Sequence, residues 1–132
     1  MDIAKRSDSN PLLKPSDLKP GIEGMEITCL LNPGVFRMNG KTWLILRVAE
    51  RPAQVSGKIS FPVYNKRGEI EVLHFDKDDP LLDASDPRVI KYKGQNYLTT
   101  LSYFRLVCSE DDINFREDPA YPPVFGKGFL ES

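Results

Sequence analysis

The sequence has 132 residues, of which 40% are hydrophobic and 28% charged, and 18 Lys and Arg against 19 Asp and Glu leave a formal net charge of -1. This length and balance predict one globular domain at most. Without a basic field or an apolar run of roughly 18 residues, we expect neither nucleic acid nor a membrane as partner. The start lacks the apolar stretch of a secretory signal, and Cys29 and Cys108 share no metal or redox spacing. We therefore expect a cytoplasmic protein without a metal, with both thiols reduced and buried in the core.

Residues 1–26 are predicted to form an irregular N-terminal leader, because Pro and Gly residues interrupt any helical periodicity there. Eight short apolar bursts follow, each of strand length and bounded by turn residues: 27–31, 35–38, 43–49, 59–63, 69–75, 88–92, 97–104 and 105–108. Asn39-Gly40 and Lys93-Gly94 are predicted hairpin loops, since Gly adopts positive φ at low cost. No window shows a clean helical stripe, so the predicted fold class is all-β.

An internal repeat is the most informative feature of the chain. Residues 32–44 recur as residues 86–98, with Asn/Asp-Pro, Val, a basic residue, Gly and an aromatic-Leu pair at matching positions. A period of about 50 residues is the size of one four-stranded antiparallel propeller blade. We therefore predict an incomplete β-propeller domain over residues 27–132, with about two blades beginning near 32 and 86. Two unrelated hairpins that share turn rules, or a small Greek-key barrel or sandwich, are the alternatives.

Several segments together resemble glycoside hydrolase family 130, the β-mannoside phosphorylases and β-mannosidases built on a five-bladed propeller. The last of these segments resembles the family's recurring Ser-x-Asp-Gly-x-x-Phe blade element, with Asp112 where Gly is usual. The segments that carry the resemblance are residues 32–36, 40–48, 85–89, 97–105 and 109–115. The resemblance implies an N-terminal portion of such an enzyme, which cleaves β-mannosides by an inverting mechanism.

The resemblance also implies what this chain lacks. In the family a Gly-x-Glu-Asp-Pro-Arg segment carries the proposed general acid, and residues 129–132 look like the approach to it. We therefore expect the chain alone to be inactive or nearly so. Glu131 is implied as a sugar or scaffold contact, but it lies one residue from the end, where chains fray. Inorganic phosphate is the implied co-substrate of a phosphorylase, with no other cofactor.

Asp86 is the candidate catalytic residue, because inverting cleavage needs carboxyl groups at the sugar and Asp86 begins a repeated strand. Arg88 is a candidate substrate-binding residue that could also orient Asp86 by charge pairing. The alternative is an Asp-Pro turn in which the carboxylate accepts backbone hydrogen bonds. Asn32, the counterpart of Asp86 in the first unit, is a candidate reader of two sugar hydroxyls or, equally, a turn cap.

Arg47 ends a very apolar strand, and its fork of donors suits a pair of hydroxyls or an anion. By resemblance it matches the arginine that lines the mannose subsite. Arg105 is a further substrate-binding candidate, with a structural ion pair as the alternative. Trp43 and Tyr97 are predicted to pack between blades, and His74 is predicted to be structural.

The expected partner is a β-mannoside oligosaccharide. Open strand edges invite pairing, so we also expect a homo-oligomer or pairing with the remainder of the propeller. A non-catalytic partial propeller that binds sugar or serves in assembly is the alternative function.

Overall fold

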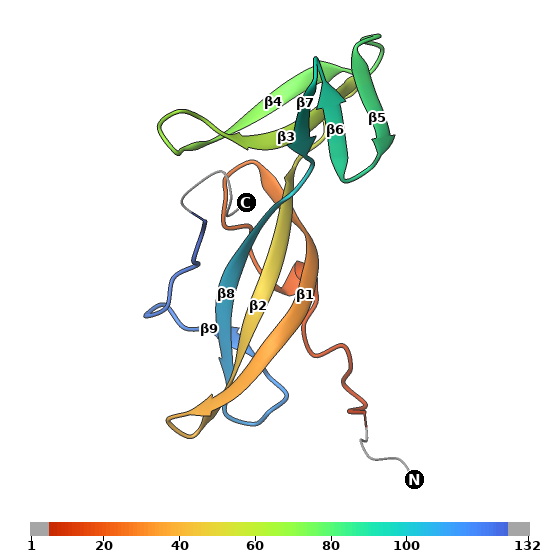
Figure 1. The fold of residues 1–132 in the computed structure, drawn as a ribbon. Helices are drawn as coiled ribbons and strands as arrows, with labels where there is room; N and C mark the ends of the chain where they lie inside the picture. Colours follow the sequence, from red (N-terminus) through yellow and green to blue (C-terminus); the bar gives the residue numbers. More distant parts are fainter. Residues whose placement is uncertain (1–5, 127–132) are drawn as a thin grey trace.

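The computed structural model describes residues 6–126, which form nine strands in three antiparallel sheets and one short 3₁₀ turn (Figure 1). The elements are η1 (Pro15–Asp17), β1 (Met25–Met38), β2 (Lys41–Pro52), β3 (Lys58–Tyr64), β4 (Ile70–Asp76), β5 (Leu82–Asp86), β6 (Val89–Tyr92), β7 (Gln95–Leu98), β8 (Leu101–Ser109) and β9 (Arg116–Glu117). No α-helix occurs within residues 6–126. The prediction of an all-β, antiparallel fold is confirmed.

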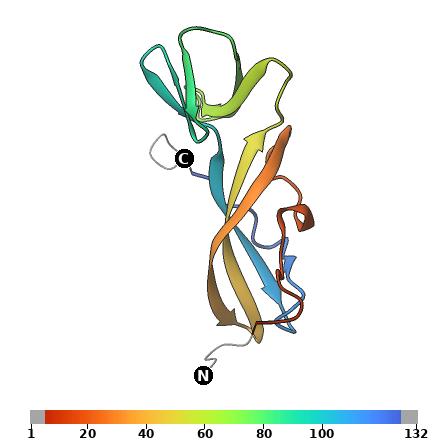
Figure 2. The ribbon, with the colours of Figure 1, turned by 90° about the vertical axis from the view of Figure 1, so that its right-hand side faces the viewer.

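The long sheet has the strand order β1-β2-β8-β9. The smaller sheets, β3-β4 and β5-β6-β7, lie together at one end of it (Figure 1). Residues 6–24 and the segment after β8 run along one side of the long sheet (Figure 2). Leu13 and Leu18 from the first segment and Phe115 and Phe125 from the second pack on its core, so both segments cover the same face.

The predicted strands are mostly present, with different boundaries. Two predicted bursts merge into β1, because residues 32–33 are absorbed as a bulge between Leu31 and Gly34. The predicted strand 97–104 is broken at residues 99–100, where the chain leaves β7 and enters β8. Strands β5 and β9 were not predicted, because their sequences are short and polar.

Both repeated segments form hairpins, as predicted. The loop residues Asn39 and Gly40 have φ of 53° and 74°, and Lys93 and Gly94 have φ of 48° and 80°, which is the conformation of a two-residue hairpin loop. The four-stranded sheet differs from a blade of consecutive strands, since it joins β1-β2 of the first unit to β8-β9 of the second. The pairing of β2 with β8 over nine residues buries the main core and therefore overrides strict sequence order.

Two cores hold the structure together. Leu46, Val48, Tyr103 and Val107 form the first, on one face of β2 and β8. The second is a set of aromatic rings between the small sheets, made by Phe61, Phe75, Tyr92 and Tyr97. Alternation along a strand sends neighbouring side chains to opposite faces. Positions 45, 47, 102 and 104 therefore lie on the face away from the first core.

A buried carboxylate ties residues 6–24 to the first core. Glu50 is fully buried, and its Oε1 accepts hydrogen bonds from the Gly21 amide at 2.7 Å and from the Tyr103 hydroxyl. Gly21 has no room for a larger residue, since a Cβ there would lie 2.6 Å from the Tyr103 hydroxyl oxygen. Arg105 adds a second tie by donating to the Lys19 carbonyl at 2.5 Å. Residues 19–21 are thus fixed against the sheet.

Burial, and then the hydrogen bond to Glu50, raise the pKa of Tyr103 well above its ordinary value. The unfolded chain then loses this proton at lower pH than the folded chain, so stability is present below about pH 10 and falls as pH rises further. We expect the midpoint of urea unfolding to decrease between pH 9 and pH 11. In Tyr103→Phe the urea midpoint should decrease less over this pH range. An equal decrease in the variant and the wild type would show that titration of Tyr103 is not its cause.

Candidate functional site

A cavity of about 480 Å³ opens where the long sheet meets the sheet of β6 and β7. It is lined by Arg47, Arg88, Leu98, Thr100, Ser102, Tyr103 and Phe104. These residues come from β2, from the loop before β6, from the end of β7 and from β8. The cavity brings together Arg47 and Arg88, two of the residues predicted to bind substrate.

Arg47 lies in the middle of β2 and is exposed, although its neighbours Leu46 and Val48 are 3% and 0% exposed. The strand alternation explains the contrast, because Leu46 and Val48 face the core and Arg47 faces away. Within residues 6–126 its guanidinium makes no hydrogen bond or ion pair with another side chain or with the backbone. Its donors are therefore available to a ligand.

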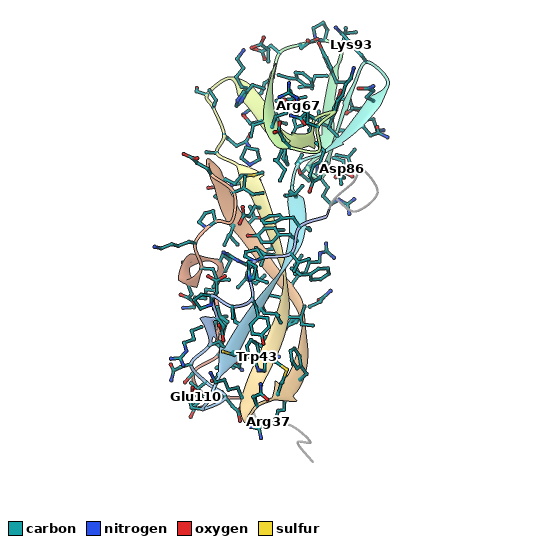
Figure 3. The ribbon with its side chains drawn as sticks, turned by 90° about the vertical axis from the view of Figure 1, so that its left-hand side faces the viewer. Arg37, Trp43, Arg67, Asp86, Lys93 and Glu110 are labelled. Carbon is teal, nitrogen blue, oxygen red and sulfur yellow. The ribbon has the colours of Figure 1, made fainter. Side chains whose placement is uncertain are left out.

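Asp86 was predicted to begin a strand, but it ends β5, because residues 87–88 form the turn that leads into β6; it lies beside the cavity residue Arg88. The Asp86 carboxylate accepts hydrogen bonds from Arg88 Nε at 3.1 Å, Arg88 Nη2 at 3.0 Å and the Arg88 backbone amide at 2.9 Å. The Asp86 carboxylate thus does both things that the sequence predicted as alternatives. It accepts a backbone hydrogen bond in the Asp-Pro turn, and it forms an ion pair with Arg88. Figure 3 shows Asp86 at the junction of the small sheets with the long sheet.

Hydrogen bonds from the Arg88 side chain, and then from its backbone amide, lower the pKa of Asp86 below its ordinary value. Asp86 is therefore ionised at neutral pH. An ionised carboxylate can accept a hydroxyl hydrogen bond or act as a base, whereas a general acid needs a raised pKa.

Asn32 and Arg105 are not among the residues that line the cavity. Asn32 lies in the bulge of β1 with φ of 38° and is exposed. Arg105 is 6% exposed on the core side of β8, where its Nε lies 2.9 Å from Glu117 Oε1. Arg105 therefore holds β9 and residue 19 in place, which was the structural alternative for this residue.

Sequence reasoning missed five residues of the cavity: Leu98, Thr100, Ser102, Tyr103 and Phe104. Phe104 is 52% exposed and is the Cα partner of Arg47 across the β2-β8 ladder. Residues 101, 103 and 105 are buried, while 102 and 104 alternate with them on the other face. The alternation of side chains along this strand was the signal in the sequence. Which of its two faces lines the cavity becomes clear only from the pairing with β2.

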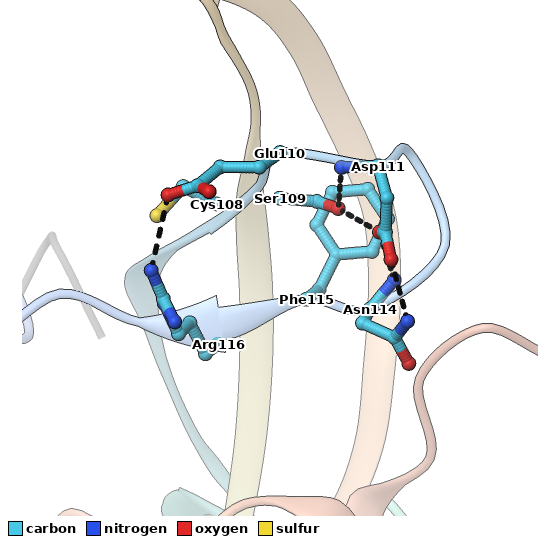
Figure 4. Close-up of a pocket in the computed structure, with 7 residues that line it drawn as sticks. All are labelled: Cys108, Ser109, Glu110, Asp111, Asn114, Phe115 and Arg116. Carbon is cyan, nitrogen blue, oxygen red and sulfur yellow. Dashed lines mark hydrogen bonds and ion pairs between the residues drawn. The ribbon is translucent and has the colours of Figure 1, made fainter.

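A second cavity, of about 330 Å³, lies at the loop after β8 and is lined by Cys108, Ser109, Glu110, Asp111, Asn114, Phe115 and Arg116 (Figure 4). Asp111 accepts hydrogen bonds from Ser109 Oγ at 2.8 Å and from the amides of Ile113 and Asn114 at 2.9 and 2.7 Å. Its carboxylate is thus occupied in shaping the loop. The Ser-x-Asp part of the blade element accordingly has a structural role here.

Asp112 has φ of 64°, the left-handed conformation that glycine adopts most readily. This explains why Gly is usual at that place. The Asp112 carboxylate offsets the cost of this backbone conformation, because it forms an ion pair with Arg37 at 3.0 Å and accepts a hydrogen bond from Thr42. The substitution thereby links the loop after β8 to the β1-β2 hairpin.

The remaining candidates are in packed or structural positions. Trp43 is 3% exposed and donates from Nε1 to the Met38 carbonyl at 3.2 Å, and the Tyr97 ring packs on Phe61. His74 Nδ1 lies 2.7 Å from Ser60 Oγ. No group of three or more His, Cys, Asp or Glu residues that could hold a metal ion occurs within residues 6–126.

Of the two cysteines, both free, Cys108 is buried as predicted. The prediction was wrong for Cys29, which is exposed, because β1 is an edge strand with a register shift between Ile27 and Cys29. Glu131 and the segment 129–132 lie outside the described residues. No helix in the described part of the chain has the length and hydrophobicity needed to cross a membrane.

Comparison with known proteins identifies one closely similar enzyme. None of the protein-family models matches the chain. The β-1,2-mannobiose phosphorylase of Listeria innocua serovar 6a is 44% identical, over 86% of this chain and 34% of its own length. The solved structure of β-1,2-mannobiose phosphorylase from Listeria innocua in complex with β-1,2-mannobiose aligns with a TM-score of 0.75 and 42% identity.

That alignment covers 88% of this chain and 35% of the solved chain. The chain therefore spans about a third of the length of the relatives it matches. At this identity and TM-score both the sequence and the arrangement of strands are shared. The resemblance to glycoside hydrolase family 130 is thereby confirmed for the part of such an enzyme that this chain spans.

Proposed function

We propose that this chain supplies part of the mannoside-binding site of a β-mannoside phosphorylase. The observation that carries the proposal is the cavity at the sheet junction, where Arg47 offers a guanidinium without a protein partner in residues 6–126. Thr100 and Ser102 add hydroxyl groups at the same place. A cavity that combines apolar side chains, here Leu98 and Phe104, with polar groups is the usual form of a small-molecule site. The similarity to an enzyme named for β-1,2-mannobiose supports a mannoside as the ligand.

The same geometry supports the proposal that the chain alone is inactive. Inverting cleavage of a glycoside needs one group that protonates the leaving oxygen and room for water or phosphate on the opposite face. No Asp or Glu lines the cavity, and Asp86, held beside it by Arg88, is ionised at neutral pH. General acid catalysis contributes typically about 10²- to 10⁴-fold. In our proposal Asp86 and Arg88 position the sugar or the attacking group, and another part of the enzyme donates the proton.

The proposal extends to how the site is completed. Val35 and Ile45 are 66% and 40% exposed, although both lie in strands of the long sheet and outside the cavity. Exposed apolar side chains in a strand are a typical docking surface. We propose that the remainder of a five-bladed propeller covers them. A homo-oligomer is the competing arrangement, and a non-catalytic sugar-binding or assembly module is the second candidate function.

The test is a phosphorolysis assay with β-1,2-mannobiose and inorganic phosphate. The chain is assayed alone and mixed with a polypeptide that carries the part of the Listeria enzyme outside the match. We expect no mannose 1-phosphate from the chain alone and measurable release from the mixture. Arg47→Ala should reduce substrate affinity in the mixture roughly 10- to 100-fold, because hydrogen bonds to a charged group are lost.

The controls separate the competing functions. Arg67→Ala removes an exposed arginine that is not among the cavity residues, and it should leave turnover unchanged. Free mannose released without phosphate would replace the phosphorylase by a hydrolase. Sugar binding by the chain with no turnover in any mixture would favour the non-catalytic module. If neither binding nor turnover occurs, the proposed function is wrong.

A further inference from the structure

Phe104 is the least expected residue of the cavity. It lies in the middle of β8, where a large aromatic side chain is usually buried, yet it is 52% exposed. Its ring lines the cavity beside Arg47, its partner across the ladder. The exposed ring is therefore placed where a ligand held by Arg47 would meet it.

The backbone at Phe104 is fixed from both sides. Its amide donates to the Val124 carbonyl at 3.0 Å, and its carbonyl accepts from the Val124 amide at 2.8 Å. On the other edge of β8, the ladder with β2 holds the same residue in register with Arg47. A side chain on such a rigid strand presents a surface of constant position, which precise recognition of a ligand requires.

The polar groups around the ring complete the pattern of a sugar site. Arg47, Thr100 and Ser102 have side-chain donors or acceptors in the cavity, and none of the three bonds through its side chain to another residue in the described range 6–126. A pyranose has an edge of hydroxyl groups and two faces of differing polarity. The cavity likewise combines hydrogen-bonding groups with one flat apolar surface.

The chemistry of mannose decides which face fits the ring. In a β-mannoside the hydrogens on C1, C3 and C5 all point to the same side, and the axial 2-hydroxyl points to the other. That side is a flat patch of C–H bonds. In an α-mannoside the glycosidic oxygen is axial and projects from this same side of the sugar. It keeps a flat ring from coming into contact with the C–H bonds. An aromatic ring packed there therefore accepts the β anomer and disfavours the α anomer.

Building on the proposed function, we propose that Phe104 is the specificity residue that selects β- over α-mannosides, by stacking on the C1, C3 and C5 face of the sugar while Arg47 and Ser102 bind its hydroxyl groups. Specificity arises here from what the ring excludes as well as from what it contacts. Aromatic contacts contribute enough beyond simple area burial for a preference of about 5-fold.

The test measures binding of methyl β-D-mannoside and methyl α-D-mannoside to the full chain by ligand-observed NMR. The wild-type chain should bind the β anomer about 5-fold more tightly. Phe104→Tyr keeps the ring and should keep this preference. Phe104→Leu keeps an apolar side chain without the ring, so the two anomers should bind within about 2-fold of each other. Because Phe104 is half exposed, both variants should fold, which their unfolding temperatures will show.

Leu81→Ala is the matched control, since Leu81 is a 58% exposed apolar residue that is not among the cavity residues. Its preference should equal that of the wild type. A Phe104→Leu protein that still prefers the β anomer would overturn the role of Phe104 and leave the sugar site intact. A wild-type chain that binds both anomers equally would do the same. A wild-type chain that binds neither glycoside, alone or mixed with the part of the Listeria enzyme outside the match, would overturn the proposed function, and this proposal with it.

Discussion

Phe61→Ala should lower the free energy of unfolding by about 3–5 kcal/mol, the typical cost of removing a buried phenylalanine. Phe61 is fully buried, and its ring centroid lies 5.1 Å from that of Phe75 and 4.9 Å from that of Tyr97. These contacts join β3 to β4 within one small sheet and to β7 of the other, so the ring links the two small sheets. The substitution therefore removes a contact that two sheets share. Urea unfolding followed by circular dichroism measures the loss.

Two further variants keep this prediction testable if Phe61→Ala does not fold. Phe61→Leu retains most of the buried surface and should unfold between the wild type and Phe61→Ala. Val55→Ala removes a similar kind of side chain that is 49% exposed, and it should stay within about 0.5 kcal/mol of the wild type. Equal midpoints for Phe61→Leu and the wild type would show that the aromatic cluster contributes little.

Glu50→Ala should lower the free energy of unfolding by about 2–4 kcal/mol, because it leaves a buried donor and a partly buried donor without their acceptor. These donors are the Gly21 amide and the Tyr103 hydroxyl. Besides this loss of global stability, residues 6–24 should detach from the long sheet more readily, because the hydrogen bond from Gly21 to Glu50 anchors them to it. We expect limited proteolysis to cut between residues 6 and 24 faster in the variant, before the rest of the chain is cleaved.

Glu50→Gln is the sharper companion variant, because it keeps the shape and one acceptor oxygen. It should cost about 1 kcal/mol. Glu23→Ala removes an exposed glutamate close to the same anchor and should unfold like the wild type. The anchoring role is contradicted if Glu50→Ala and Glu23→Ala give the same unfolding midpoint and the same cleavage rate.

The parts of the fold that sequence predicted are those set by local chemistry. The loops at Asn39-Gly40 and Lys93-Gly94 need positive φ, and short apolar runs predict most of the strands. The pairing of β2 with β8 is not local. It joins residues such as Val48 and Tyr103, and it depends on which apolar faces match after the chain has folded.

The candidate site divides in the same way. Arg47 was predicted because it ends a very apolar strand and matches, by resemblance, an arginine of the mannose subsite, and Arg88 because it follows the repeated Asp-Pro; the cavity brings the two together. Phe104 was missed because an aromatic residue inside a predicted strand is most simply assigned to the core. Arg105 was a candidate for the site, but one step along the strand sends it to the opposite face.

The ladder between β2 and β8 also has a kinetic consequence. Residues 53–100 lie between these strands and contain both small sheets, whose strands pair mainly with near neighbours in the chain. Local hairpins form in microseconds, whereas strands that are distant in the sequence pair only after the entropic cost of closing the intervening loop has been met. The small sheets should therefore form first and shorten the loop, so the closing of β8 onto β2 sets the folding rate. Destabilising substitutions within residues 58–98 would then slow folding and leave the unfolding rate nearly unchanged, although these residues lie outside the ladder between β2 and β8.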